Sequence, residues 1–413
     1  MKRTVTSLIV AAVAGLLAGV LLTLVIVVPL IEPPAGPDTD EAAQAAPITP
    51  PPTVGTSPAP LPTLTQDSGT KEDETEESEE PQETEEPEED RGKDDEPITT
   101  PGIEAQAQPG QADLPDYERL DCPAATTQVA TSEELQQALD TAAPGDVIEL
   151  GDGVYGGSFV ARSSGTPQDR IFLCGGRGAV LDGGSIKGGY VFHLDQAEHW
   201  ALIGFTVRNG QKGVMADSTT GTVIQELTVT GIGDEAIHLR KNSTANVVLG
   251  NTISNTGLRK PKFGEGVYIG SAESNWCTVT DCLPDRSDRN VIAGNTITGT
   301  TSESIDVKEG TVHGLIIDNT FDGSALSGAD SWVDVKGTAW TITGNRGEDT
   351  PLDGFQTHEI VDGWGTRNLF VDNTAIVNGA GHAIATRPER ANIVDCANLV
   401  ENAEQGLTNA DCR

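Results

Sequence analysis

The second half of the chain repeats itself. The segment DEAIHLRKNSTANVVLGNTISNTG, which begins at Asp234, can be laid over SESIDVKEGTVHGLIIDNTFDG, which begins at Ser302. Looser copies place equivalent apolar residues 22 to 38 residues apart, at Ile237, Val267, Ile305, Val333, Phe355 and Ile384. Each copy has two or three short strands with turns between them and cannot bury an apolar face alone. The repeat therefore predicts a solenoid of stacked parallel strands rather than a sandwich.

Asparagine recurs at one position of the repeat, mostly followed by threonine. The residues are Asn251, Asn295, Asn319, Asn345 and Asn373. Stacked amides can donate and accept hydrogen bonds along the axis of a solenoid. We therefore assign this row to structure rather than to catalysis.

An amphipathic segment, TSEELQQALDTAAPGDVIEL, precedes the repeats. Thr131 or Ser132 can cap a helix, Leu135 and Leu139 share one face, and PGD ends it before the strand VIEL. A helix in this position is expected to cap the open end of the stacked core.

The first 114 residues have a different composition. After Lys2 and Arg3 the chain carries no charge from Thr4 to Ile31, a length that can cross a bilayer, and the basic flank should stay cytoplasmic. We expect residues 1–31 to be a transmembrane signal anchor, with a long signal peptide as the alternative. Residues 32–114 are rich in proline and acids and are expected to form a disordered spacer. The predicted location is the cell membrane, single-pass with the domain 115–413 outside the cell, or alternatively secretion.

Charge and cysteine content agree with an exported domain. The formal net charge is −37, and within residues 67–96 acids outnumber bases by 17 to 3. The folded part is also acidic, which disfavours nucleic acid as a partner. All six cysteines lie beyond the anchor, and an even number favours disulfides. Spacing suggests the local pairs Cys277–Cys282 and Cys396–Cys412, leaving Cys122 with Cys174.

The pattern resembles that of the right-handed parallel β-helix proteins. In particular, PGDVIELGDGVYGG and SSGTPQDRIFLCGGRGAVLDGG are similar to the first rungs of bacterial polysaccharide lyases of the chondroitinase B and alginate lyase type. The resemblance covers about residues 131–402. It implies an all-β, single-stranded right-handed parallel β-helix and an activity on acidic polysaccharide.

Charged residues line up when the repeats are aligned in parallel register, since equivalent residues of neighbouring rungs lie about 4.8 Å apart. One outward row is His238, Tyr268, Asp306, Asp334, Gln356 and Ala385, and a second, two residues on, is Arg240, Gly270, Lys308, Lys336, His358 and Arg387. A third, at the strand entrance, contains Glu235, Glu265 and Glu303. Glu303 shares the inward phase of Ile305, so it can face out only from the turn before the strand. The alternative is that these acids are turn residues on a solvated face.

Eliminative cleavage of a uronate chain needs a positive charge on the sugar carboxylate, a base for the C5 proton and a donor for the departing O4. Calcium accepts six to eight oxygens, so carboxylates on adjacent rungs could hold it. We expect Glu265 and Glu303 as the central ligands, with Glu235 and Asp306 as further ones. Lys308 is the expected base, its pKa lowered by a nearby cation and partial desolvation.

The resemblance adds a motif, in which a calcium-ligand Glu is followed five residues later by the base Lys. Glu303 and Lys308 have that spacing. The family's Arg one rung further corresponds to Lys336, and a second acidic ligand is replaced by Thr301. Lys336, His358 and Arg387 could neutralise the substrate or protonate the leaving group.

Further residues are expected to contact substrate around this face. They are Arg240, Arg259, Lys260, Lys262, Tyr268, Asp334 and Trp364. Trp364 lies in a glycine-flanked loop where it could stack on a sugar, or it covers the edge of the solenoid. For His358, the sequence favours a structural hydrogen-bonding role over a catalytic one.

The sequence therefore predicts a calcium-assisted lyase, acting as a monomer on an acidic polysaccharide. Two alternatives remain: a β-helix glycoside hydrolase, because Asp306 and Asp334 are stacked carboxylates, and a cell-surface glycan-binding protein without catalysis. Fold alone cannot separate them.

Overall fold

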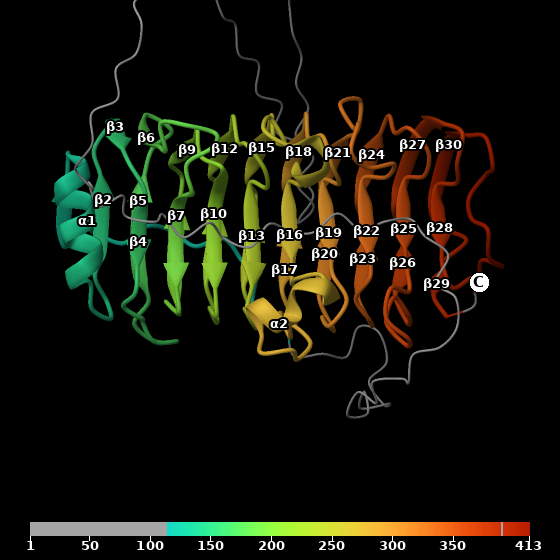
Figure 1. The fold of residues 1–413 in the computed structure, drawn as a ribbon, viewed down its shortest axis with the longest axis horizontal. Coiled ribbons are helices and arrows are strands. Elements are labelled where there is room, and N and C mark those ends of the chain that lie inside the picture. Colours follow the sequence, from blue (N-terminus) through green and yellow to red (C-terminus); the bar gives the residue numbers. More distant parts are fainter. Residues whose placement is uncertain (1–113, 390) are drawn as a thin grey trace, which may run out of the picture. The chain divides into compact units, whose positions relative to one another are not determined.

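A computed structural model describes residues 114–389 and 391–413. In this part the chain winds into an all-β parallel solenoid of about ten turns (Figure 1). The predicted anchor, residues 1–31, and all of the predicted spacer except its last residue lie outside the described residues. No helix among the described residues has the length and apolar character needed to span a bilayer.

Three parallel sheets run along the solenoid, and each complete turn contributes one strand to each sheet. The eleven-stranded sheet contains β1 (Thr127–Val129), β2 (Val147–Leu150), β5 (Ile171–Gly175), β8 (Trp200–Ile203), β11 (Val223–Gln225), β14 (Val247–Leu249), β17 (Val291–Ala293), β20 (Leu315–Ile317), β23 (Thr341–Thr343), β26 (Leu369–Val371) and β29 (Ile393–Val394). The ten-stranded sheet contains β3 (Gly153–Gly156), β6 (Ala179–Asp182), β9 (Thr206–Arg208), β12 (Thr228–Thr230), β15 (Thr252–Ser254), β18 (Thr296–Thr298), β21 (Thr320–Asp322), β24 (Arg346–Glu348), β27 (Thr374–Gly379) and β30 (Leu399–Ala403).

The nine-stranded sheet carries the charged rows. It contains β4 (Phe159–Ala161), β7 (Tyr190–Asp195), β10 (Lys212–Asp217), β13 (Ile237–Arg240), β16 (Val267–Ile269), β19 (Ile305–Val307), β22 (Val333–Val335), β25 (Phe355–Thr357) and β28 (Ile384–Thr386). The described residues also include four helical segments: α1 (Ser132–Thr141), η1 (Pro261–Phe263), η2 (Glu273–Asn275) and α2 (Trp276–Val279). Figure 1 shows α1 at the end of the solenoid where its first turns lie.

The register of the nine-stranded sheet is the one that the repeat predicts. Val267 pairs with Ile237 and with Ile305, and Ile305 pairs with Val333. These inward residues are fully buried. The outward residues of the same strands, Tyr268 and Asp306, are also direct neighbours. The alternation of the short strands was therefore sufficient to place one row in the core and one on the outer face.

The asparagine row forms a hydrogen-bonded ladder inside the solenoid. Asn319 Nδ2 donates to Asn345 Oδ1 at 2.9 Å, and Asn319 Oδ1 accepts from Asn295 Nδ2, also at 2.9 Å. The second Nδ2 hydrogen of Asn319 goes to the Ile292 carbonyl at 2.9 Å. The structural assignment of this row is confirmed.

Replacing a ladder residue should destabilise the protein. In Asn319→Ala, buried donors and acceptors on two neighbouring turns lose their partner, and each such group costs about 1–3 kcal/mol. We expect a loss of about 2–4 kcal/mol in the free energy of unfolding, measured by urea denaturation. Gln405→Ala is the control, because that exposed amide makes one hydrogen bond to Ala380. Equal stability of the two variants would contradict the proposed role of the ladder.

The three expected disulfides are present. They join Cys122 to Cys174, Cys277 to Cys282 and Cys396 to Cys412. The first ties the segment before β1 to β5, and the carbonyl of Leu120 in this segment accepts from the Gln225 side chain at 2.9 Å. The second lies in the long connection 270–290 between β16 and β17, which becomes important at the site.

Candidate active site

A cleft of about 850 Å³ lies over the later turns of the nine-stranded sheet. Its floor carries outward or strand-end side chains, namely Tyr268, Asp306, Lys308, Asp334, Lys336, Gln356, His358 and Arg387. One wall is built where the strands begin, by Lys262 and Phe263 of η1 and by residues 327–330. The other wall is built where β16 ends, by Ala272, Ser274 and Asn275.

Three carboxylates meet at one side of this cleft. Glu265 and Glu303 come just before β16 and β19, and Asp306 is the outward residue of β19. Oxygen atoms of all three lie within 4.8 Å of one another. Glu303 thus faces the cleft from the turn before β19. This is the placement expected from its alternation with the inward residue Ile305.

Within this carboxylate cluster (Glu265, Glu303 and Asp306), Asp306 is paired with lysines, whereas Glu265 is short of compensating contacts. Burial raises the pKa of Glu265 well above its ordinary value, and the carboxylates of Glu235, Glu303 and Asp306 raise it further. Burial likewise raises the pKa of Glu303, with Asp306 adding to the effect. Glu265 Oε2 is buried and accepts no hydrogen bond within the described structure. The cluster therefore favours the uptake of positive charge, as a proton or as a cation.

Two lysines stand beside the cluster on adjacent turns. Lys308 Nζ lies 3.1 Å from Asp306 Oδ2. Lys336 Nζ bridges two acids, lying 2.9 Å from Asp306 Oδ1 and 2.9 Å from Asp334 Oδ2. Burial opposes the charge on Lys336, but Asp306 and Asp334 outweigh it and raise its pKa. Lys336 is consequently a fixed cation.

The expected lowering of the Lys308 pKa is wrong for the protein on its own. Burial does favour the neutral amine, but the carboxylates of Asp306, Glu309 and Glu303 outweigh it, so the pKa of Lys308 lies well above its ordinary value. Glu309, a buried residue next to Lys308, was not anticipated as a contributor. Lys308 can act as a base only when positive charge elsewhere in the cleft offsets these acids.

The far end of the cleft holds a histidine and an arginine on consecutive turns. His358 Nδ1 lies 2.9 Å from Asp334 Oδ2, and Arg387 lies 3.2 Å from Asp353. The Asp334 carboxylate raises the pKa of His358 despite partial burial of the ring. About a third of the His358 side chain and nearly half of the Arg387 side chain, 32% and 45%, remain exposed. Both can therefore reach a ligand in the cleft.

Several residues expected at the site lie outside the cleft lining. Glu235 is not in the carboxylate cluster, because it pairs with Lys212 at 3.2 Å. Arg240 pairs with Asp217 at 2.9 Å, and Arg259 forms an ion pair with Asp234. Lys260 lies over the Phe263 ring at 5.1 Å.

Trp364 cannot stack on a sugar from the surface. Its side chain is buried, with 2% exposed, and it does not line the cleft. The alternative reading, in which the indole covers the solenoid, matches its position.

The cleft walls were not anticipated residue by residue. Phe263, Ala272, Ser274 and Asn275 lie in connections that interrupt the repeat, where no pattern predicts a conformation. Long connections were nevertheless visible as unequal spacing of the repeats, since β16 and β19 bracket the largest interval. Glu273 N donates to Glu309 Oε1 at 2.5 Å, and the Trp276 indole donates to the Ser271 carbonyl at 3.0 Å, which together fix the wall over the end of β19.

Comparison with solved structures finds several similar chains. An alginate lyase from Paenibacillus sp. strain FPU-7 is 34% identical, with a TM-score of 0.61, and the match covers 69% of this chain and 100% of that one. A pectate lyase is 12% identical over 70% of this chain and 79% of its own, with a TM-score of 0.48. A surface adhesin of Streptococcus pneumoniae is 11% identical over 68% of this chain and 75% of its own, with a TM-score of 0.41. No protein-family model and no curated protein matches the sequence.

Proposed function

Because the chain belongs to the family of β-helix polysaccharide lyases that includes the Paenibacillus alginate lyase, we propose that it cleaves an acidic, uronate-containing polysaccharide by β-elimination in this cleft. The observation that carries the proposal is the pairing of Lys308 and Lys336 with a buried carboxylate cluster on adjacent turns. A surface serving only to display charge would not bury these groups together.

Different residues of the cleft are proposed for the separate roles that β-elimination requires. Lys308 is the proposed base for the C5 proton, since it is the lysine with a single direct carboxylate partner in the cleft. Lys336 is too firmly held as a cation to exchange protons, so it would neutralise the sugar carboxylate. His358, whose pKa is raised by Asp334, would hold the proton destined for O4 of the departing sugar. Arg387 would bind a carboxylate further along the chain.

Calcium is proposed as an additional cation at the carboxylate cluster. The residues fit such an ion, because three oxygen ligands converge and one Glu265 oxygen is buried without a hydrogen bond. Glu265, Glu303 and Asp306 would hold it. A bound calcium ion would supply positive charge that acidifies the C5 proton and offsets the acids around Lys308. Glu235 is left out of the ligand set, since it is paired with Lys212.

Calcium binding should be measurable without turnover. We expect calcium to raise the melting temperature of the protein, and magnesium to do so less, because magnesium demands a stricter octahedral shell. Glu265→Gln should abolish most of the calcium effect, whereas Glu273→Gln, a change of similar size in the cleft wall connection, should retain it. Calorimetric titration of the protein with calcium checks this directly. An unchanged response in Glu265→Gln would exclude the cluster as the site.

The test of the function uses the double bond that elimination leaves between C4 and C5, which absorbs in the far ultraviolet. The protein is incubated with pectate, alginate, chondroitin, heparin and gellan, each with calcium and with a chelator. We expect absorbance to rise on one polymer. Reducing ends without absorbance would indicate hydrolysis, and retention on a polymer without either product would indicate a binding protein.

We propose that the domain works outside the cell. The three disulfides favour an oxidising compartment, and the uncharged run from Thr4 to Ile31 would export and anchor the chain. An acidic polysaccharide of the surroundings is then the proposed partner.

A further inference from the structure

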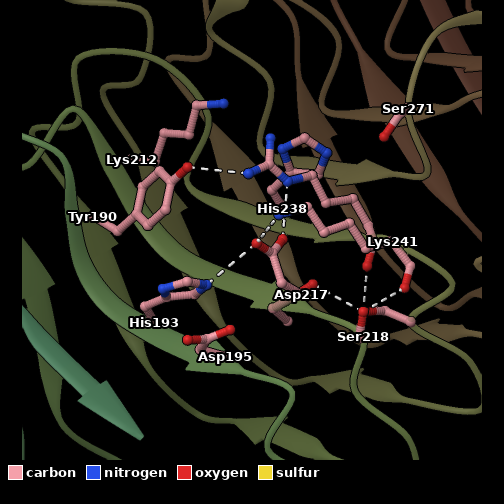
Figure 2. A network of polar contacts seen from close by, with 12 residues as sticks. Tyr190, His193, Asp195, Lys212, Asp217, Ser218, His238, Lys241 and Ser271 are labelled. Atoms are coloured by element: carbon pink, nitrogen blue, oxygen red, sulfur yellow. Dashed lines mark hydrogen bonds and ion pairs between the residues drawn. The ribbon is translucent and has the colours of Figure 1, made fainter. Parts of the chain in front are cut away.

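Outward polar side chains on the earlier turns of the nine-stranded sheet are paired with one another. Asp217 on β10 accepts from Arg240 Nε and from Lys241 Nζ, both at 2.9 Å, and its Oδ2 atom lies 3.3 Å from His193 Nε2 (Figure 2). None of these four side chains lines the cleft. Gln356, the outward residue of β25, differs in both respects. It lines the cleft, and one of its polar atoms has no partner among the described residues.

The amide of Gln356 is held in one orientation. Its Nε2 atom donates to Asp330 Oδ1 at 2.9 Å and to Asp353 Oδ2 at 3.0 Å, which uses both amide hydrogens. Turning the amide over would place Oε1 against two carboxylate oxygens, where no hydrogen is available to bond them. Asp330 and Asp353 therefore fix Oε1 as a neutral hydrogen-bond acceptor.

Oε1 of Gln356 is open to the cleft. The residue as a whole is only 2% exposed, and Oε1 accepts no hydrogen bond within the described part of the chain. It is nevertheless absent from the fully buried side-chain atoms that lack a partner there. An unpartnered atom that is not fully buried, in a residue that lines the cleft, has the cleft as its opening to solvent. A ligand in the cleft can therefore donate a hydrogen bond to Oε1.

Asp353 links this acceptor to the cation on the next turn. Its Oδ2 atom accepts from Gln356 Nε2 and from Arg387 Nη2, the latter at 3.2 Å, and the residue is 1% exposed. In the sheet, Gln356 pairs with Ala385, two residues before Arg387. One buried carboxylate thus positions a neutral acceptor and a half-exposed guanidinium on the cleft floor. A uronate sugar offers the matching groups, a carboxylate for Arg387 and hydroxyls for Gln356.

We propose that Gln356 is a specificity-determining residue, which accepts a hydrogen bond from a free hydroxyl of a uronate sugar in the cleft. This inference rests on the proposed function and names a feature that the substrate must carry. The hydroxyl belongs to a sugar beyond the one that loses its C5 proton, because β25 lies two turns, about 10 Å, from β19 and Lys308. An O-acetylated hydroxyl has no hydrogen to donate and would place ester oxygens against Oε1. A polymer acetylated on its hydroxyls should therefore be a poor substrate.

The test compares two preparations of the polymer that the protein cleaves, one unmodified and one O-acetylated on its secondary hydroxyls. For the wild-type full chain, we expect KM to be about tenfold higher for the acetylated polymer. Gln356→Met keeps the length of the side chain but removes the acceptor. It should raise KM for the unmodified polymer about three- to tenfold, as expected for one hydrogen bond, and reduce the ratio of the two KM values by the same factor.

Two further variants control this comparison. Gln356→Asn keeps an amide but withdraws it from the cleft, so it should give the same shift, and it replaces Gln356→Met if that variant does not fold. Gln405→Met makes the same chemical change at an exposed amide outside the cleft lining and should match wild type. In the two Gln356 variants kcat should change by less than about twofold, because the lost contact is remote from the reacting atoms.

The outcomes separate this inference from the proposed function. Cleavage with equal wild-type KM values for the two polymers overturns the inference and leaves the function intact. Variants of Gln356 that lower the melting temperature without changing the KM ratio also overturn it, since they show a structural link between two carboxylates only. If the wild type cleaves nothing, calorimetry measures binding of both polymers to the full chain. A preference for the unmodified polymer that is lost in Gln356→Met then upholds the inference although the function fails, and no binding overturns both.

Discussion

Lys308→Ala should abolish most of the lyase activity while leaving the protein folded. Removal of a positioned base costs about 10²–10⁴-fold in rate. The fold should survive, because Asp306, the partner of Lys308, keeps its contact with Lys336 at 2.9 Å. Initial rates from ultraviolet absorbance give the loss of kcat, and calorimetry of the same variant with substrate should show binding within a few-fold of wild type.

Two further variants separate a base from a mere positive charge. Lys308→Arg keeps the cation but cannot accept a proton near neutral pH, so it should be about as inactive as Lys308→Ala. Lys187→Ala removes an exposed lysine outside the cleft and should be fully active. Substantial activity in Lys308→Arg would show that charge, not proton abstraction, is what Lys308 supplies.

The pH dependence of the wild-type rate should also show whether Lys308 acts as a base. The raised pKa of Lys308 means that the free protein holds the protonated, inactive form at neutral pH. A base must be unprotonated and the donor His358 must keep its proton, so kcat/KM should rise with pH on the acid side of the profile and stop rising once His358 titrates. A profile with no rise on the acid side would point to a different base.

The fold followed from the sequence because a solenoid is built from local rules applied repeatedly. The apolar row through Ile237, Val267 and Ile305 fixed which side chains enter the core, and stacking then fixed the neighbours of each outward residue. The asparagine row set the same register independently. With the register known, the proximity of Glu265, Glu303 and Asp306 could be predicted without any three-dimensional information.

The site was less predictable where it depends on connections rather than on repeats. The indole of Trp364 is buried, although its glycine-flanked segment gave no sign of the direction in which it points. Glu235 occupies the same position of the repeat as Glu265, but Lys212, one turn earlier, pairs with it.

The electrostatic balance around a charged side chain is the second feature of the site that the sequence could not predict. The sum of Asp306, Glu309 and Glu303 around Lys308 depends on distances that the sequence does not contain, and here it reversed the expected shift of the pKa.

Lys336→Met should be the most destabilising single change in the cleft. Lys336 is the shared partner of Asp306 and Asp334, and all three side chains are at least nine-tenths buried. Loss of one member of a buried ion network leaves uncompensated charge and costs about 3–5 kcal/mol. Urea denaturation at neutral pH measures this loss. Lys262→Met, on the exposed lip of the same cleft, should change the free energy of unfolding little.

The effect of pH distinguishes lost charge compensation from lost packing in Lys336→Met. Burial opposes ionisation of Asp334, but Lys336 and His358 outweigh it and hold its pKa far below the ordinary value in the wild-type protein. A depressed carboxylate pKa stabilises the fold above the unfolded-state pKa, and that contribution disappears as pH falls through the folded-state pKa. Without Lys336, Asp334 can be neutralised by protonation at mildly acidic pH. The difference in stability between wild type and Lys336→Met should therefore shrink as pH is lowered from neutral toward about 4, the range in which free aspartate titrates. A difference that stays constant over this range would mean that the lysine stem contributes through packing, and that the carboxylates of the cleft do not depend on it for their charge.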